Sequence, residues 1–233
     1  MAIVNIETAT TICSVSLAEK GLAVFEKASF DGLSHASLLG VFVEEAVKEA
    51  KSLNLKIDAV AVSGGPGSYT GLRIGVSMAK GLCFGWNVPL INVPTLDILA
   101  SKAIESVSGK PSEALFCAML DARRMEVYAA LYDHLLHKVR DTEAEIVTED
   151  SYSSFLEKQQ VYFFGNGVGK CKSVLLSPNA LFIDNLYPLA GDMALLSELA
   201  YSENRFENVA YFEPFYLKDF IATVSKNKAL SEK

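Results

Sequence analysis

The chain has 233 residues and a mass of 25.3 kDa, which suits one large domain or two small ones. Half of its residues are hydrophobic, which excludes a disordered chain and allows a substantial core without disulfides. It carries 28 acidic against 21 basic residues, a formal net charge of −7. This balance excludes a broadly basic nucleic-acid binder, whose affinity depends on neutralising phosphates.

The four cysteines are far apart in the sequence and form no Cys-x-x-Cys pair, which favours reduced, buried side chains. Residues 1–5 lack the charged start and apolar stretch of a signal peptide. The sequence contains no run of about 18 uncharged apolar residues, which is the length needed to span a membrane. We therefore expect a cytoplasmic protein without a membrane partner.

Hydrophobic patterning predicts a first unit in which three strands joined by tight turns are followed by alternating helices and strands. This order is typical of a mixed sheet with helices packed on it. The expected elements are strands 2–7, 12–18 and 22–29, helix 35–53, strand 59–62, helix 70–84, strand 90–93 and helix 95–107.

Beyond residues 106–112, where Ser, Gly, Lys and Pro cluster, the pattern partly repeats in a degenerate form. The expected elements there are strands 115–120 and 126–132, helix 152–158, strands 161–164 and 181–183, and helix 191–203. We therefore divide the chain into a first unit, 1–105, to which 212–224 returns, and a smaller second unit, 106–211. Residues 225–233 are polar and lysine-rich, and we expect a frayed tail.

A glycine-rich turn at residues 63–71 lies between an expected strand and an expected helix. Such a turn can present backbone N–H groups to a phosphate, yet it matches neither the Walker sequence nor Gly-x-Gly-x-x-Gly. We favour a structural explanation of its glycines over phosphate binding: they permit a tight turn and close packing of the helix that follows. Gly65 and Gly67 stay candidates for a loop that contacts a nucleotide or a partner.

Two other loops resemble parts of a nucleotide cleft. Glu7 and Thr8 end the first strand, where a phosphotransferase of this architecture would hold magnesium and phosphate. Asp121 and Arg123 lie at the equivalent hairpin of the second unit, which lacks the glycines needed for close approach to a phosphate. For Arg123, a solvated turn and an anion or partner contact are equally favoured. Only half of a nucleotide site is present, and nucleotide hydrolysis is not expected.

The histidines do not predict a metal centre. His134 and His137 lie three residues apart beside Asp133 in a polar turn, which favours solvated side chains over metal ligands. Neither a third ligand nor a Ser/His/Asp order stands out. We therefore expect no catalytic residue, no cofactor and no bound metal.

The second expected helix is apolar on nearly every side, with four glycines between residues 71 and 85. Each glycine costs about 1 kcal/mol relative to alanine in a helix, and a helix keeps such residues where another backbone approaches closely. The helix expected at 35–53 has a similarly broad apolar face. Since few elements remain to cover both helices, we predict that a partner packs against them. The residues that we place at this contact are Leu39, Val43, Leu72, Arg73, Gly75, Val76 and Ala79.

Four stretches together resemble the TsaB (YeaZ) family over nearly the whole chain. They are residues 2–17, Gly-Pro-Gly-Ser-Tyr-Thr-Gly-Leu-Arg-Ile-Gly at 65–75, Asp-Ala-Arg-Arg-Met-Glu-Val-Tyr at 121–128 and Tyr-Leu-Lys at 216–218. The combination of the two long blocks is highly specific. The resemblance implies an actin/Hsp70-like fold (ASKHA, RNase H-like) with two similar subdomains. Departures are small: Glu7 replaces a frequent Asp, Met125 a usual Gly and Lys218 a usual Arg.

The resemblance also implies a role in forming N6-threonylcarbamoyladenosine at position 37 of tRNAs that read codons beginning with A. In this pathway the transferase TsaD acts on tRNA, and TsaB is its non-catalytic partner. The ATPase TsaE completes the assembly, TsaB alone forms a homodimer, and its contact with tRNA is indirect. The family places the TsaD contact and the homodimer on the first two helices. The His-x-x-x-His metal pair of TsaD is missing, since residues 94–99 contain no histidine.

The leading hypothesis is therefore an accessory scaffold subunit without chemistry of its own. One alternative is a weak ATPase or sugar-kinase-like phosphotransferase that uses Glu7, Thr8 and Asp121. A metalloprotease is the other alternative, for which the sequence offers no ligand cluster.

Overall fold

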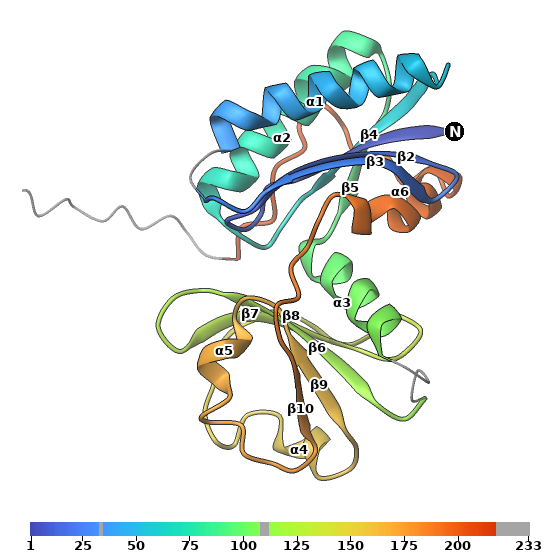
Figure 1. The fold of residues 1–233 in the computed structure, drawn as a ribbon. Helices are drawn as coiled ribbons and strands as arrows, with labels where there is room; N and C mark the ends of the chain where they lie inside the picture. Colours follow the sequence, from blue (N-terminus) through green and yellow to red (C-terminus); the bar gives the residue numbers. More distant parts are fainter. Residues whose placement is uncertain (33–34, 108–111, 218–233) are drawn as a thin grey trace, which may run out of the picture.

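The structure is a computed structural model that describes residues 1–32, 35–107 and 112–217. Two α/β units lie one above the other in Figure 1, each built around a five-stranded mixed sheet. The first unit contains β1 (Ala2–Glu7), β2 (Cys13–Glu19), β3 (Leu22–Ser29), α1 (His35–Ser52), β4 (Ile57–Ser63), α2 (Tyr69–Trp86) and β5 (Leu90–Val93).

The second unit repeats this order with shorter helices. Helix α3 (Thr95–Ser106) leads into it. It contains β6 (Leu115–Asp121), β7 (Glu126–Tyr132), β8 (Lys138–Ile146), α4 (Ser153–Leu156), β9 (Val161–Phe164), α5 (Val168–Cys171) and β10 (Ala180–Ile183). A short 3-10 helix, η1 (Gly191–Met193), and α6 (Ala194–Ser202) follow.

The two sheets have the same topology. Their strand orders are β3-β2-β1-β4-β5 and β8-β7-β6-β9-β10. In each, three antiparallel strands are followed by two parallel ones, so β6 occupies the place of β1. The prediction of two similar units, the second degenerate, is confirmed.

The first sheet is covered on both faces, which explains why every residue of β1 is buried and most of them are apolar. Val4 points to the side of α1 and α2, where it joins a core cluster with Leu39 and Val76. Ile3 points to the opposite side and packs in a cluster with Met193, next to α6. Figure 1 shows α1 and α2 side by side above this sheet and α6 below it.

The last helix of each unit packs on the sheet of the other unit. Helix α3 follows β5 but contacts β6 and β7, whereas α6 follows β10 and contacts β1 and β5. An ion pair of 2.6 Å between Lys102 Nζ of α3 and Asp192 Oδ2 of η1 joins the exchanged elements. The expected second unit, 106–211, therefore contains a helix that packs on the first sheet. The chain returns to the first unit earlier than at residue 212.

The end of the described chain stays on the first unit. Glu207 N donates to Leu90 O at 2.8 Å, and Phe212 packs against the core beneath α2. Phe215 N donates to Gly64 O at 2.7 Å. The described part of the expected return, 212–217, thus lies against the first unit. Residues 218–224 and the expected tail, 225–233, lie outside the described residues.

Some elements of the second unit were not predicted. Strand β8 is an edge strand whose sequence, Lys-Val-Arg-Asp-Thr-Glu-Ala-Glu-Ile, is mostly charged and half-exposed, so hydrophobic alternation could not reveal it. Helix α4 is shorter than the predicted 152–158, and α5 was not predicted. The four cysteines are free and buried, as predicted. Among the described helices, none is long and apolar enough to cross a membrane.

Two aliphatic side chains on α1 test this packing. Leu39 is 1% exposed and Val41 is 47% exposed. We expect Leu39→Ala to lower the free energy of unfolding by about 2–5 kcal/mol because it leaves a cavity. Val41→Ala serves as the control on the same helix, with a change within about 0.5 kcal/mol. Urea unfolding measures both, and equal losses would contradict the assigned orientation of α1.

Candidate functional site

The turn after β1 holds a buried carboxyl group. Glu7 has no exposed surface, and its Oε1 accepts a hydrogen bond from Ala9 N at 2.5 Å. Its other oxygen, Oε2, is buried without a hydrogen-bond partner among the described residues. Burial raises the pKa of Glu7 to about 7, because the charged form is poorly solvated there. In this position Glu7 cannot face a solvated magnesium ion or phosphate.

Backbone covers this turn from the side of the glycine-rich loop. Ser68 N donates to Ala9 O at 2.7 Å, and Thr8 Oγ1 donates to Gly71 O at 2.8 Å. A Cβ on Gly71 would overlap Thr8 O, and one on Gly75 would overlap Thr8 Oγ1. The glycines therefore let α2 lie directly on residues 8 and 9. A phosphate has no room there.

The same loop is closed from a second side by the end of the chain. Gly65 has φ +110°, and a Cβ there would come within 2.8 Å of Phe215 O. Gly67 lies against Ala9 in the same way. The structure therefore brings Glu7, Thr8, Gly65 and Gly67 together in one closely packed cluster. Close packing of the glycine-rich loop against Ala9 and Phe215 accounts for Gly65 and Gly67, in agreement with the explanation that we favoured from the sequence.

The equivalent hairpin of the second unit is exposed but occupied by its own ion pair. The Asp121 carboxylate pairs with Lys170 Nζ and accepts a hydrogen bond from Arg123 N at 3.2 Å. The backbone N–H of Asp121 donates a hydrogen bond to Asn166 Oδ1 at 2.9 Å. Arg123 has φ +70° and is exposed. Since Lys170 offsets the charge of Asp121, this hairpin offers no free carboxylate for a metal ion.

The described residues do not assemble a metal site. Within residues 1–32, 35–107 and 112–217, no group of three His, Cys, Asp or Glu side chains could hold a metal ion. The turn that contains His134 and His137 lies at the end of β7, where His137 Nδ1 is 3.0 Å from Asp133 Oδ2.

The residues that we placed at a partner contact lie on the inner side of the two helices. Six of the seven are buried against the first sheet. These are Leu39, Val43, Leu72, Gly75, Val76 and Ala79. Only Arg73 is exposed. In the chain alone these six residues belong to the core side of the helices, because apolar residues on a helix first cover the protein's own core. Their place at a partner contact stays a prediction, as does the partner contact of the two helices.

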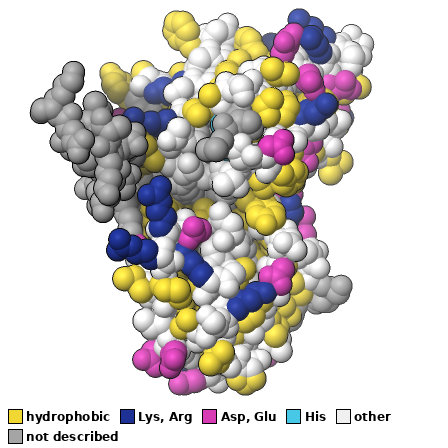
Figure 2. Space-filling model, turned by 60° about the vertical axis from the view of Figure 1, so that its left-hand side comes forward, with side chains coloured by type: hydrophobic (Ala, Val, Ile, Leu, Met, Phe, Trp, Pro, Cys, Tyr) yellow, Lys and Arg dark blue, Asp and Glu magenta, His cyan; other side chains and the backbone are white. Residues whose placement is uncertain are grey.

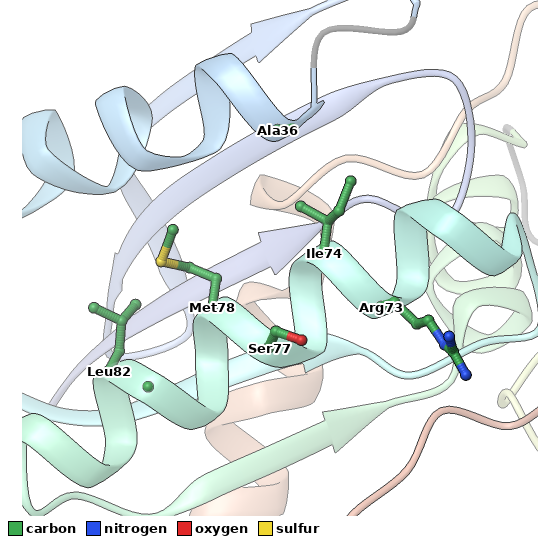
Figure 3. Close-up of a pocket in the computed structure, with 7 residues that line it drawn as sticks. Ala36, Arg73, Ile74, Ser77, Met78 and Leu82 are labelled. Carbon is green, nitrogen blue, oxygen red and sulfur yellow. The ribbon is translucent and has the colours of Figure 1, made fainter.

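The outer side of the same helices forms an apolar groove of about 600 Å³. Figure 3 shows Ile74, Met78 and Leu82 in a row on the side of α2 that faces α1, while Arg73 points the other way. Their spacing of four residues places them on one stripe of the helix. The complete lining is Ala36, Arg73, Ile74, Ser77, Met78, Gly81 and Leu82.

Two glycines of α2 differ from the others. A Cβ on Gly81 or Gly85 would meet nothing within 4 Å, in contrast to Gly71 and Gly75. Phe84, between them, is 85% exposed. Contacts among the described residues therefore do not account for either glycine. The sequence showed four glycines in one helix but could not separate the inner pair from the outer pair.

Comparison with known proteins identifies the family. The family model "TsaD: tRNA N6-adenosine threonylcarbamoyltransferase" matches residues 31–230. The chain is 30% identical to the tRNA threonylcarbamoyladenosine biosynthesis protein TsaB of Escherichia coli, over 95% of this chain and 96% of that protein. The chain is a member of the TsaB (YeaZ) family. The resemblance found in the sequence is therefore confirmed.

Solved structures support the fold. A Pseudomonas aeruginosa protein described as similar to the peptidase YeaZ superposes with a TM-score of 0.79 at 25% identity, over 93% of this chain and 99% of that one. A Listeria monocytogenes protein assigned to the N-acetylmannosamine kinases superposes with a TM-score of 0.51 at 10% identity, covering 88% of this chain and all of that one. The second likeness concerns the fold alone. This member of the TsaB family has the expected actin/Hsp70-like α/β fold.

The buried carboxyl of Glu7 makes stability depend on pH. Its folded pKa of about 7 exceeds the ordinary 4.5, so between these values the folded chain keeps a proton that the unfolded chain has lost. We expect the free energy of unfolding to fall by up to about 3 kcal/mol as pH rises from 5 to 8. Glu7→Gln should remove this part of the slope, and Glu44→Gln on the exposed side of α1 should not. Equal slopes in the wild type and Glu7→Gln would contradict the assignment.

The inner and outer glycines should respond oppositely to alanine. Gly75→Ala forces a methyl group into Thr8, and we expect it to lower the free energy of unfolding by about 1–3 kcal/mol or more. Gly81→Ala adds helix propensity in open space and should raise it by up to about 1 kcal/mol. Thermal and urea unfolding of the two variants measure the difference. The same sign for both would contradict the described position of α2.

Proposed function

We propose that this chain is a non-catalytic scaffold subunit in the formation of N6-threonylcarbamoyladenosine in tRNA. In this proposal it binds a TsaD-type transferase through the outer side of α1 and α2. The proposal starts from the membership of the TsaB family and from the biosynthetic pathway that the relatives' names state.

The observation that carries the proposal is the apolar surface on α1 and α2, which no other described residue covers. Gly40, Gly81 and Gly85 have open space or a single distant methyl group beside them, which permits a second backbone to approach closely. Val41 and Phe84 are exposed apolar side chains on the same two helices. A surface of small and apolar residues around a groove fits a protein partner better than it fits solvent.

The closed turn at the end of β1 supports the part of the proposal that gives this chain no catalytic activity of its own. Glu7 is buried and Thr8 is covered by α2, so the first half of a phosphate site is filled by the protein's own backbone. Asp121 is paired with Lys170. An enzyme of this architecture needs these positions open to substrate and metal.

The proposal also includes the other expected partners, of which a second copy of the chain would use the same surface. In the absence of the transferase, two copies of the chain can cover their apolar grooves by forming a homodimer. A TsaE-type ATPase would join the assembly of scaffold and transferase. Contact with tRNA stays indirect, because a net charge of −7 opposes binding to phosphates. Figure 2 shows Lys and Arg side chains gathered on one face near the junction of the two units, so any tRNA contact is local.

The alternative is a weak ATPase or phosphotransferase that uses Glu7, Thr8 and Asp121. Its support is the fold shared with an N-acetylmannosamine kinase. Calorimetry with magnesium and ATP separates the two proposals. Binding in the micromolar range by the isolated chain, abolished by Asp121→Asn, would favour the alternative, and no measurable heat would favour the scaffold.

A pair of exposed helical glycines provides a matched test of the interface. A Cβ on Gly81 of α2 or on Gly169 of α5 would meet nothing within 4 Å, so arginine fits at either position in the free chain. We expect Gly81→Arg to weaken binding of the TsaD-type transferase about 100-fold or more, because it places a charge in an apolar contact. Gly169→Arg should bind as the wild type does.

Titration calorimetry of each variant against the transferase gives the dissociation constants, and thermal unfolding checks that both variants are folded. Size-exclusion chromatography with light scattering then compares the chain alone with the mixture. Normal binding by Gly81→Arg would show that the outer side of α2 is not the contact. Loss of binding in both variants would point to a general defect instead.

A further inference from the structure

The turn between β6 and β7 carries two neighbouring arginines in a left-handed backbone conformation. Arg123 has φ +70° and Arg124 has φ +52°. Residues other than Gly, Asn and Asp rarely adopt this conformation, because their Cβ crowds the following carbonyl oxygen. Among the described residues, no other two neighbouring non-glycine residues both have positive φ. The hairpin therefore keeps two long side chains at positions where Asn or Gly would strain the backbone less.

Elsewhere the chain uses asparagine for this conformation. Asn54, Asn87, Asn185 and Asn204 all have positive φ, and Asn87 is the left-handed cap that ends α2. The same residue type would suit the β6–β7 turn, so closing the hairpin does not require arginine. A role outside the fold therefore explains the two arginine side chains better than the turn itself does.

The two arginines are not used inside the protein. Both are exposed, and neither side chain has an ion pair or hydrogen bond with any other described residue. The other three arginines of the chain, Arg73, Arg140 and Arg205, each contact a carboxylate or a tyrosine hydroxyl. Arg123 and Arg124 therefore differ from them in having their hydrogen-bond donors directed to no described group.

The acidic group nearest in sequence does not cancel this charge. The Asp121 carboxylate pairs with Lys170 Nζ, which also donates to Glu126 O at 2.6 Å. Lys170 thus joins both strand ends beneath the turn. With Arg123 and Arg124, this end of the hairpin has three basic against two acidic residues, a net charge of +1, in a chain whose net charge is −7.

Two exposed guanidinium groups on one turn suit phosphate groups. Each guanidinium stays protonated at neutral pH and can donate two parallel hydrogen bonds to the oxygens of one phosphate. Neighbouring arginines can thus contact successive phosphates of a nucleic-acid backbone, a contact that requires no particular base sequence. In the proposed function the transferase acts on tRNA, so an RNA backbone is the polyanion that the assembly meets.

We propose that the Arg123–Arg124 turn contacts the phosphate backbone of the tRNA while this chain is bound to the transferase. The inference rests on the proposed function, because the transferase brings the tRNA. It goes beyond that function, in which the chain meets tRNA only indirectly. The turn adds one local contact to the binding that the transferase provides. The net charge of −7 still opposes binding of tRNA by the chain alone.

The test replaces both arginines with a residue that suits the turn. Arg123→Asn with Arg124→Asn removes both guanidinium groups and relieves the backbone, so the thermal midpoint of the free chain should stay unchanged or rise by up to about 4 °C. In complex with the TsaD-type transferase, this variant should bind tRNA about five- to tenfold more weakly. The slope of log K against log salt should become shallower by about 1–2. Fluorescence anisotropy of labelled tRNA measures affinity and slope.

Two lysines provide a control that removes the same charge. Lys56 and Lys158 are exposed and directly precede the regions of β4 and β9, the equivalent strands of the two units. Because β9 is parallel to β6, Lys158 lies at the opposite end of the second sheet from the turn. We expect Lys56→Ala with Lys158→Ala to bind tRNA as the wild type does.

The outcomes separate this proposal from the proposed function. Unchanged affinity and slope in the asparagine variant, or an equal loss in the lysine control, would overturn the RNA contact. Weaker binding of the transferase by the asparagine variant without tRNA would also overturn it and assign the turn to an acidic protein surface.

A wild-type chain that binds no transferase would instead refute the proposed function. The turn is then measured in the chain alone at low salt, where electrostatic contacts with phosphate are strongest. The asparagine variant should still bind tRNA more weakly than the lysine control, and equal binding of the two would overturn the RNA contact.

Discussion

The close approach of α2 to the turn after β1 is the contact on which the rest of the first unit depends. It requires the lack of a side chain at Gly67, Gly71 and Gly75, because each would collide with residue 8 or 9. The contact seals Glu7 away from water and raises its pKa. It also turns the opposite side of α2 outwards beside α1. One packing constraint therefore closes the place where a related phosphotransferase would hold phosphate and presents an apolar surface instead.

The exchange of the last helices explains how two small sheets form one protein. Helix α3 leaves the first sheet to cover the second, and α6 returns to cover the first. The Lys102–Asp192 ion pair joins these two exchanged elements. In each unit, one face of the sheet is therefore covered by a helix that follows the last strand of the other unit. This exchange favours cooperative folding of the two units. For the proposed scaffold role, cooperative folding would keep the surface of α1 and α2 in one arrangement for a partner.

Patterning revealed the first unit almost completely, since strands such as Ala2–Glu7 and helices such as Tyr69–Trp86 have long apolar runs bounded by turn residues. It missed the charged edge strand Lys138–Ile146, which buries little apolar surface. At the candidate site, the packing role of the glycines was predictable from their spacing. The outward residues were not, because Gly75 and Gly81 look alike in sequence and differ only in what the folded chain places beside them.

Hydrogen–deuterium exchange of the full chain, alone and with the TsaD-type transferase or with magnesium and ATP, tests the scaffold role most directly. We expect slower exchange in α1 and α2 on adding the transferase. We expect no change at the turn after β1 or in the glycine-rich loop on adding magnesium and ATP. Protection of these two loops by ATP, with α1 and α2 unchanged by the transferase, would contradict a scaffold without chemistry of its own.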